Sequence, residues 1–90
     1  MSGFSPDVVQ RTILDLAAAR GPDKTICPSE AARALAGDDP ERWSKLMPAV
    51  RRAAIGLMRE GRVEIRRKGR RVDPDDFRGV YRIAISRPAE

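Results

Sequence analysis

Apolar residues recur at helical spacing in three stretches of the sequence. The first, residues 5–21, opens with Ser-Pro-Asp, as helix N-termini often do, and ends with a glycine that is followed by proline. Residues 28–37 form the second stretch, and about residues 44–60 form the third and longest, preceded by a short turn at 40–43. Pro48 must lie in the first turn of that helix, because only there is its missing N–H tolerated. The pattern predicts three helices.

Two stretches near the C-terminus alternate between apolar and polar residues, as strands do. They are residues 62–67 and 80–86, and their inward positions are Val63, Ile65, Tyr81, Ile83 and Ile85. A Lys-Gly pair at 68–69 marks a turn, and we expect the strands to form an antiparallel hairpin with a loop of roughly a dozen residues. A shorter extended segment is expected around Thr25 and Ile26, because Pro28 disfavours helical geometry just before it.

This order of elements predicts the fold class. Helix, short strand, helix, helix, strand, loop and strand is the order of a winged helix-turn-helix domain. The expected fold is therefore α+β, with three helices plus a short antiparallel β-hairpin wing that supplies a second packing layer. A chain of 90 residues has room for one such domain over residues 1–90, with an ordered core at about 5–86 and a frayed tail at 87–90.

Three longer strings carry a family resemblance: "ICPSEAARAL", "WSKLMPAVRRAAIGLMREGRVEI" and "RKGRRVDPDDFRGVYRI". Over about residues 8–86, the sequence resembles a family of small bacterial proteins that is described only as a domain of unknown function. The resemblance implies a winged-helix-like fold and implies no particular activity. Function therefore has to be argued from the residues themselves.

Positive charge is concentrated in one short segment. The net charge is +5, and residues 62–72 hold six basic residues and one acid, whereas the rest of the chain carries both signs equally. Five of the six residues in "RRKGRR", 66–71, are cationic. Charge gathered in this way attracts anions more strongly than the same charge spread over the surface. The predicted wing is therefore a candidate site for contact with a nucleic acid.

The glycine of the predicted turn is flanked by Arg66, Arg67, Lys68, Arg70 and Arg71. Wings lie along phosphates or enter a minor groove, where arginine is favoured by the negative potential. The alternative is charge that protects an edge strand against association, although one or two lysines would serve that purpose. Asp73, Asp75 and Asp76 follow, and they either pair with the arginines or cap a turn. We expect capping for Asp73, because proline follows it.

The exposed side of the third helix is a second candidate, and its cations are Lys45, Arg51, Arg52 and Arg59. Three of them recur every seven residues and so lie nearly in line, with Arg51 to one side. Ala49 and Gly56, between the cations, are small enough to let a phosphate backbone approach. In helix-turn-helix proteins this helix enters the major groove, where arginine reads guanine. The alternative is a solvated, arginine-rich face without a ligand.

Three interpretations of the basic segments stay open. We expect DNA binding, with the third helix in the major groove and the wing on the phosphate backbone. The wing could instead dock on an acidic protein partner, or the domain could bind RNA by shape and charge. DNA binding requires that wing and helix share one side of the molecule, and that Arg52 and Arg59 are free of internal ion pairs. The sequence indicates no oligomeric state.

Residues that enzymes and metal sites need are scarce. One cysteine and no histidine exclude an internal disulfide, the common zinc sites and triads with a histidine base. The sequence has neither a phosphate-binding glycine loop nor an activated nucleophile pair, and the spacing of Asp73–Asp76 does not fit a calcium loop. We therefore expect no enzyme activity, no metal and no cofactor.

Two single residues and the cellular location complete these expectations. Cys27, at the start of the second helix, is expected to be a small core residue, with redox sensing as the minor alternative. Trp43 is expected to anchor the core rather than to stack on a base. The sequence has neither an apolar run long enough for a membrane span nor an export signal. A single cysteine fits a reducing compartment, so we expect a cytoplasmic protein without membrane contact.

Overall fold

Helical elements make up most of residues 6–59. The computed structural model describes residues 4–87, so residues 88–90 of the tail that was expected to be frayed lie outside the described residues. The helical elements are α1 (Pro6–Arg20), α2 (Pro28–Ala36), the single turn α3 (Pro40–Trp43), a 3-10 turn η1 (Ser44–Leu46) and α4 (Met47–Arg59). None of these helices combines the length and apolar character that a membrane span requires.

Capping residues and one proline determine where these helices begin. The side chain of Ser5 accepts a hydrogen bond from the Val8 N–H at 3.3 Å, which caps α1. A carboxylate oxygen of Asp39 accepts the Glu41 N–H at 3.0 Å and caps α3 in the same way. The third predicted helix starts later than expected, because Pro48 has no N–H to donate to the Ser44 carbonyl in the α-helical pattern. The N–H of Met47 donates to that carbonyl instead, which closes a 3-10 turn before α4.

A three-stranded antiparallel sheet follows the helices. Its strands are β1 (Val63–Arg67), β2 (Arg70–Arg71) and β3 (Arg82–Ile85), in the order β2-β1-β3. The predicted pairing of the two longer strands is confirmed, with Ile65 opposite Ile83. Strand β2 was not expected: it lies in the stretch predicted as the loop of the hairpin, and it folds back on β1 through a tight turn at Lys68 and Gly69. The expected extended segment is confirmed by an isolated antiparallel bridge between Ile26 and Ile83.

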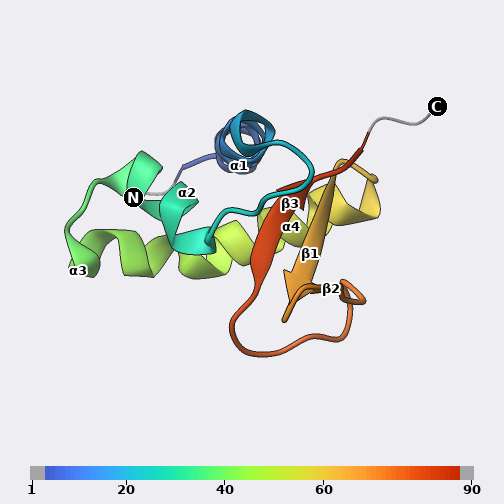
Figure 1. The fold of residues 1–90 in the computed structure, drawn as a ribbon. Coiled ribbons are helices and arrows are strands. Elements are labelled where there is room, and N and C mark those ends of the chain that lie inside the picture. The colour runs from blue at the N-terminus through green and yellow to red at the C-terminus, as the bar shows by residue number, and fades with distance from the viewer. Residues whose placement is uncertain (1–3, 88–90) are drawn as a thin grey trace.

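The core lies between the helices and one face of the sheet. In Figure 1, α4 passes behind the sheet and α1 lies end-on above it, while the segment between β2 and β3 extends away from α1. The largest fully buried side chains are Val9, Ile13, Ile26, Val50, Leu57, Val63, Ile65 and Ile83. The second predicted helix adds the buried residues Ala31 and Ala32, so each predicted helix and strand contributes to the core. The molecule is of the α+β class, as expected.

Candidate nucleic-acid interface

The β1–β2 turn distributes its cations over both faces of the sheet. Arg66 lies opposite Arg71, and Arg67 lies opposite Arg70. Directly opposed residues of an antiparallel pair share a face, and successive residues alternate between faces. The Arg67–Arg70 pair therefore lies on the face of the core residue Ile65, and the Arg66–Arg71 pair lies on the other face. The basic segment is not one uniform patch.

Two of the five cations of the β1–β2 segment, residues 66–71, make contacts within the molecule. Arg66 contacts a carboxylate oxygen of Glu64 through two of its nitrogens, each at 3.1 Å, and reaches the Pro22 carbonyl at 3.4 Å. Arg67 donates from Nε to the Val80 carbonyl at 3.0 Å. Both arginines are half-buried. These contacts fix the position of the β1–β2 turn relative to the neighbouring loops. Both guanidinium groups are therefore less available to a ligand than an exposed arginine would be.

The other three cations of this segment point into solvent. Lys68, Arg70 and Arg71 are exposed, and their side chains make no hydrogen bond or ion pair with the residues that the structure describes. Lys68 has φ 53° and Gly69 has φ 80°, so both central residues of the turn are left-handed. This two-residue turn places the three cations at the end of the β1–β2 ribbon.

On α4 and the turn before it, the predicted line of cations is exposed. Lys45 and Arg52 make no polar side-chain contact within residues 4–87. Arg59 pairs with Asp75 of the loop after β2, and the two side chains are 60% and 65% exposed. This ion pair within the molecule joins α4 to the loop and is accessible to solvent, so the expectation of no internal ion pair is met by Arg52 and not by Arg59. Asp73 caps the same loop, because its Oδ1 accepts the Asp75 N–H at 2.9 Å, as expected.

Arg51 turns toward the protein. Its guanidinium lies 3.9 Å from the centre of the Phe77 ring and 5.8 Å from that of Tyr81. Its Nη2 also donates to the Phe77 carbonyl at 2.8 Å, and the residue is half-buried. We therefore leave Arg51 out of the candidate interface. It joins α4 to the loop that precedes β3.

Gly56 does not open the cationic line to a phosphate backbone, and that interpretation was wrong. A Cβ atom at Gly56 would lie 3.3 Å from Nε2 of Gln10, which belongs to α1. The small residue therefore allows α1 and α4 to pack closely. Ala49 is half-buried as well. The exposed residues of α4 are Pro48, Arg52 and Arg59, so neither small residue lies on the exposed surface between the cations.

A comparison with family models matches residues 6–86 to the family described as "Protein of unknown function (DUF3253)". The chain belongs to this family. The matched residues run from the start of α1 to just beyond β3, so the DUF3253 unit includes both cationic segments. No curated protein matches the chain.

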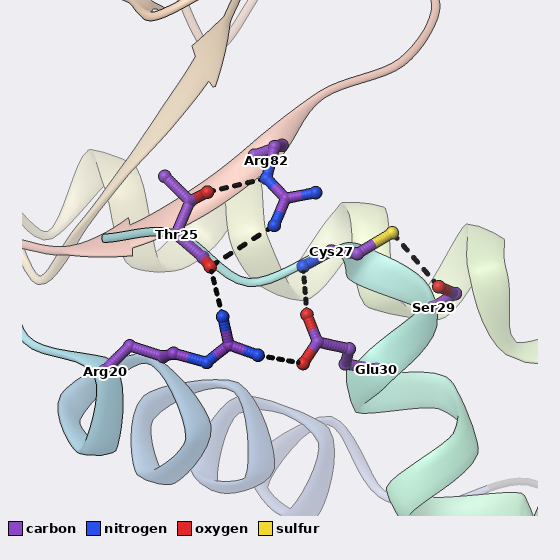
Figure 2. Close-up of polar contacts among 6 residues, drawn as sticks. All are labelled: Arg20, Thr25, Cys27, Ser29, Glu30 and Arg82. Atoms are coloured by element: carbon purple, nitrogen blue, oxygen red, sulfur yellow. Dashed lines mark hydrogen bonds and ion pairs between the residues drawn. The ribbon is translucent and has the colours of Figure 1, made fainter.

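A polar network in this DUF3253 domain involves arginines that the sequence did not single out (Figure 2). Arg82 of β3 donates to Thr25 Oγ1 at 2.6 Å and to the Thr25 carbonyl at 3.4 Å. Arg20 donates to the same carbonyl at 3.3 Å and to Glu30 at 2.8 Å. The other Glu30 oxygen accepts the Cys27 N–H at 2.6 Å. The outward position of Arg82 follows from strand alternation, whereas its partner, far away in sequence, does not.

Cys27 and Trp43 are both half-buried and contact neighbouring residues of this domain. The Cys27 sulfur lies 3.0 Å from the Ser29 hydroxyl oxygen, and the residue is half-buried at the N-terminus of α2. Trp43 is half-buried, packs against the core, and has the Arg33 guanidinium 5.9 Å from its ring centre. Among the described residues, no group of three or more His, Cys, Asp or Glu side chains could hold a metal ion. The exposed cations therefore remain the best candidate for a functional site.

Proposed function

We propose that this DUF3253 domain is a winged helix-turn-helix module that binds duplex DNA. In this arrangement α4 lies in the major groove and the β1–β2 turn lies on the phosphate backbone. Element order supports the assignment, since the three helices α1, α2 and α4 precede a sheet in which β1 and β3 pair and Ile26 bridges to β3. The loop between β1 and β3, with β2 inside it, corresponds to the wing.

The observation that carries the proposal is a set of exposed cations without partners among residues 4–87: Lys45, Arg52, Lys68, Arg70 and Arg71. The wing loop is held against α4 by the Arg59–Asp75 ion pair and by the contact of Arg51 with Phe77. These contacts support a shared surface for helix and wing. Cations that have no internal partner keep their full charge available for phosphates.

The backbone at Lys68 is further support. Two-residue hairpin turns with both residues left-handed strongly favour Asn-Gly or Asp-Gly, since other side chains are strained there. A lysine at φ 53° therefore costs stability that asparagine would not. Backbone strain of this kind is enriched at functional sites. A cation at the most protruding position of the ribbon fits contact with a phosphate.

Salt dependence tests the proposal directly. Five to six neutralised phosphates predict that log K falls with log salt at a slope of about −4.5 to −5.4. The measurement is fluorescence anisotropy of a labelled duplex titrated with the full chain at several salt concentrations. Arg70→Ala with Arg71→Ala should reduce the slope by about 2. Absence of binding to any duplex at roughly 0.05 M salt, where phosphate contacts are strongest, would refute DNA binding.

A matched control separates a local interface from general charge attraction. Arg11 on α1 and Lys24 before the Ile26 bridge are exposed, and neither has a polar side-chain partner in the described residues. Changing both to alanine removes the same charge as the double wing variant. The slope should then change by less than half as much. Competition by duplex RNA and single strands distinguishes DNA from RNA, and nuclease-resistant capture by one acidic protein would favour a protein partner instead.

A further inference from the structure

One exposed apolar side chain lies next to the basic turn. Val80 is 83% exposed, whereas the other exposed large apolar residues of the described chain, Phe4 and Val8, are 42% and 45% exposed. Single exposed apolar residues are common on protein surfaces and need no special explanation. Val80 differs because the chain around it is fixed by specific contacts.

Arg67 fixes the backbone on which Val80 lies. Its Nε binds the Val80 carbonyl at 3.0 Å, and its Nη2 would lie only 3.1 Å from a Cβ atom placed on Gly79. Gly79 has φ 80°, a left-handed conformation that other residues adopt only with strain. The glycine therefore permits both the turn and the close approach of the guanidinium. The guanidinium lies over this turn.

Buried aromatic rings anchor both ends of the same turn. Phe77 and Tyr81 are 6% and 7% exposed, and their ring centres are 5.3 Å apart in an edge-to-face contact. Only the three residues between them, Arg78, Gly79 and Val80, are exposed at this point of the loop. We define these residues, 78–80, as the loop tip. Because the buried rings of Phe77 and Tyr81 fix both ends of the loop tip, the side chain of Val80 stays exposed to solvent.

The chemistry of the loop tip differs from that of a phosphate contact. Arg78 is exposed, and its side chain has no polar partner in the part of the chain that the structure describes. A phosphate contact would use the arginine and gain nothing from the valine. A narrow minor groove would accommodate both residues: the arginine would lie in the groove, and the apolar side chain would contact the sugars or base edges. Because Arg67 lies at the end of β1 and binds Val80, the loop tip is adjacent to Lys68.

We infer that the loop tip, Arg78–Gly79–Val80, enters the minor groove of A·T-rich DNA, while Lys68, Arg70 and Arg71 contact the flanking phosphates. This inference rests on the proposed DNA binding and adds a sequence preference to it. A·T-rich tracts have the narrow groove and strong negative potential that favour an inserted arginine. The valine adds van der Waals contact that does not depend on salt.

Two duplexes of equal length test the inference, one with a central A·T tract and one with a central G·C tract. The full chain should bind the A·T duplex about tenfold more tightly, the effect of roughly one specific base-pair contact. Val80→Ser should reduce binding to the A·T duplex by about fivefold with an unchanged salt slope, since it removes apolar contact and no charge. Val8→Ser is the matched control on α1 and should bind like the unaltered chain. Thermal unfolding of both variants should match that of the unaltered chain, because both side chains are exposed.

Each outcome leads to a separate conclusion. If the chain binds DNA but shows no A·T preference, or if Val80→Ser binds as the unaltered chain does, the minor-groove inference is wrong and DNA binding stands. If the chain binds neither duplex at roughly 0.05 M salt, both ideas are wrong. Competition by a small minor-groove ligand such as netropsin should displace the chain, and its failure would also overturn the inference. Binding to anionic lipid vesicles that is lost in Val80→Ser would assign the loop tip to membranes instead.

Discussion

Replacing Arg51 and replacing its neighbour Arg52 should have opposite consequences, although each change removes one positive charge from α4. Arg51 contacts the ring and the carbonyl of Phe77, whereas Arg52 is exposed and makes no polar contact within residues 4–87. Methionine is a suitable replacement at both positions, because it is unbranched, favours helix and keeps much of the apolar stem of arginine. The pair of variants separates a cation that stabilises the fold from one that is available to a ligand.

The contacts of Arg51 give the magnitude of its effect. A hydrogen bond from a charged donor contributes about 1.5–3 kcal/mol to stability, and a partly desolvated cation–π contact contributes about 1–2 kcal/mol. Methionine regains some packing against the ring, so Arg51→Met should lower the free energy of unfolding by about 2–3 kcal/mol. Arg52→Met should change it by less than about 0.5 kcal/mol, as for other exposed residues without partners.

Urea unfolding, monitored by circular dichroism, measures both changes in the free energy of unfolding. The slope of this free energy against urea concentration should be the same in both variants, because the same surface becomes exposed. The salt titration of DNA binding should be affected by Arg52→Met and not by Arg51→Met. Arg52→Met should reduce the slope of log K against log salt by about 0.9, whereas Arg51→Met should leave it nearly unchanged while the protein is folded. A loss of less than about 0.5 kcal/mol in Arg51→Met would refute its assignment as a structural cation. Equal DNA slopes for the two variants would refute the assignment of Arg52 to the interface.

Three further predictions follow from single residues. Asp75→Asn should free Arg59, raising DNA affinity about fivefold at 0.15 M salt, the value that one added phosphate contact gives; unchanged affinity in anisotropy titrations would show that Arg59 makes no phosphate contact. Lys68→Asn should raise the free energy of unfolding by about 0.5–1 kcal/mol, because asparagine tolerates the left-handed turn, while the DNA salt slope falls by about 1; a loss of stability in urea would contradict the strain argument. Burial raises the pKa of Tyr81 to about 12, and nearby Arg51 partly opposes that rise. The phenol of the unfolded chain titrates near 10, so the contribution of Tyr81 is complete below about pH 10 and about 2–3 kcal/mol is lost as pH rises to about 12. The chain has one tyrosine, so ultraviolet absorbance reports this titration directly, and a midpoint near 10 in the folded protein would contradict it.

Elements whose defining contacts are close in sequence could be predicted from local sequence signals. The cap at Ser5 depends on an N–H only three residues away, and the inward side of β1 follows from alternation alone. The pairing of β1 with β3 was also predictable, since both strands have one apolar face and a turn signal between them. Strand β2 was missed because a two-residue strand of arginines has no alternation to detect.

The direction of individual arginines could not be predicted in the same way. Helical spacing placed Arg51 between the core side and the exposed side of α4, where either direction is allowed. Its actual direction depends on Phe77, which lies 26 residues later in a loop without periodicity. Gly56 is a similar case, because its neighbour Gln10 belongs to a helix whose position on α4 is a tertiary property. Spacing thus placed Arg52 and Arg59 on the exposed side of α4 but could not say which cations have partners.

Net charge and available charge therefore differ in this domain, and the difference bears on function. The segment 62–72 accounts for the whole net charge of +5, yet the structure ties Arg66 to Glu64 and Arg67 to the Val80 carbonyl. An arginine that donates through a planar fork can hold a carbonyl and still cover a glycine, which a lysine ammonium cannot do. Such arginines shape the β1–β2 ribbon and the loop tip, and the remaining cations on these elements face solvent. Ligand affinity should consequently depend on the orientation that Arg67 imposes as well as on the number of charges, and charge-preserving Arg67→Lys should weaken sequence preference more than it weakens total DNA affinity.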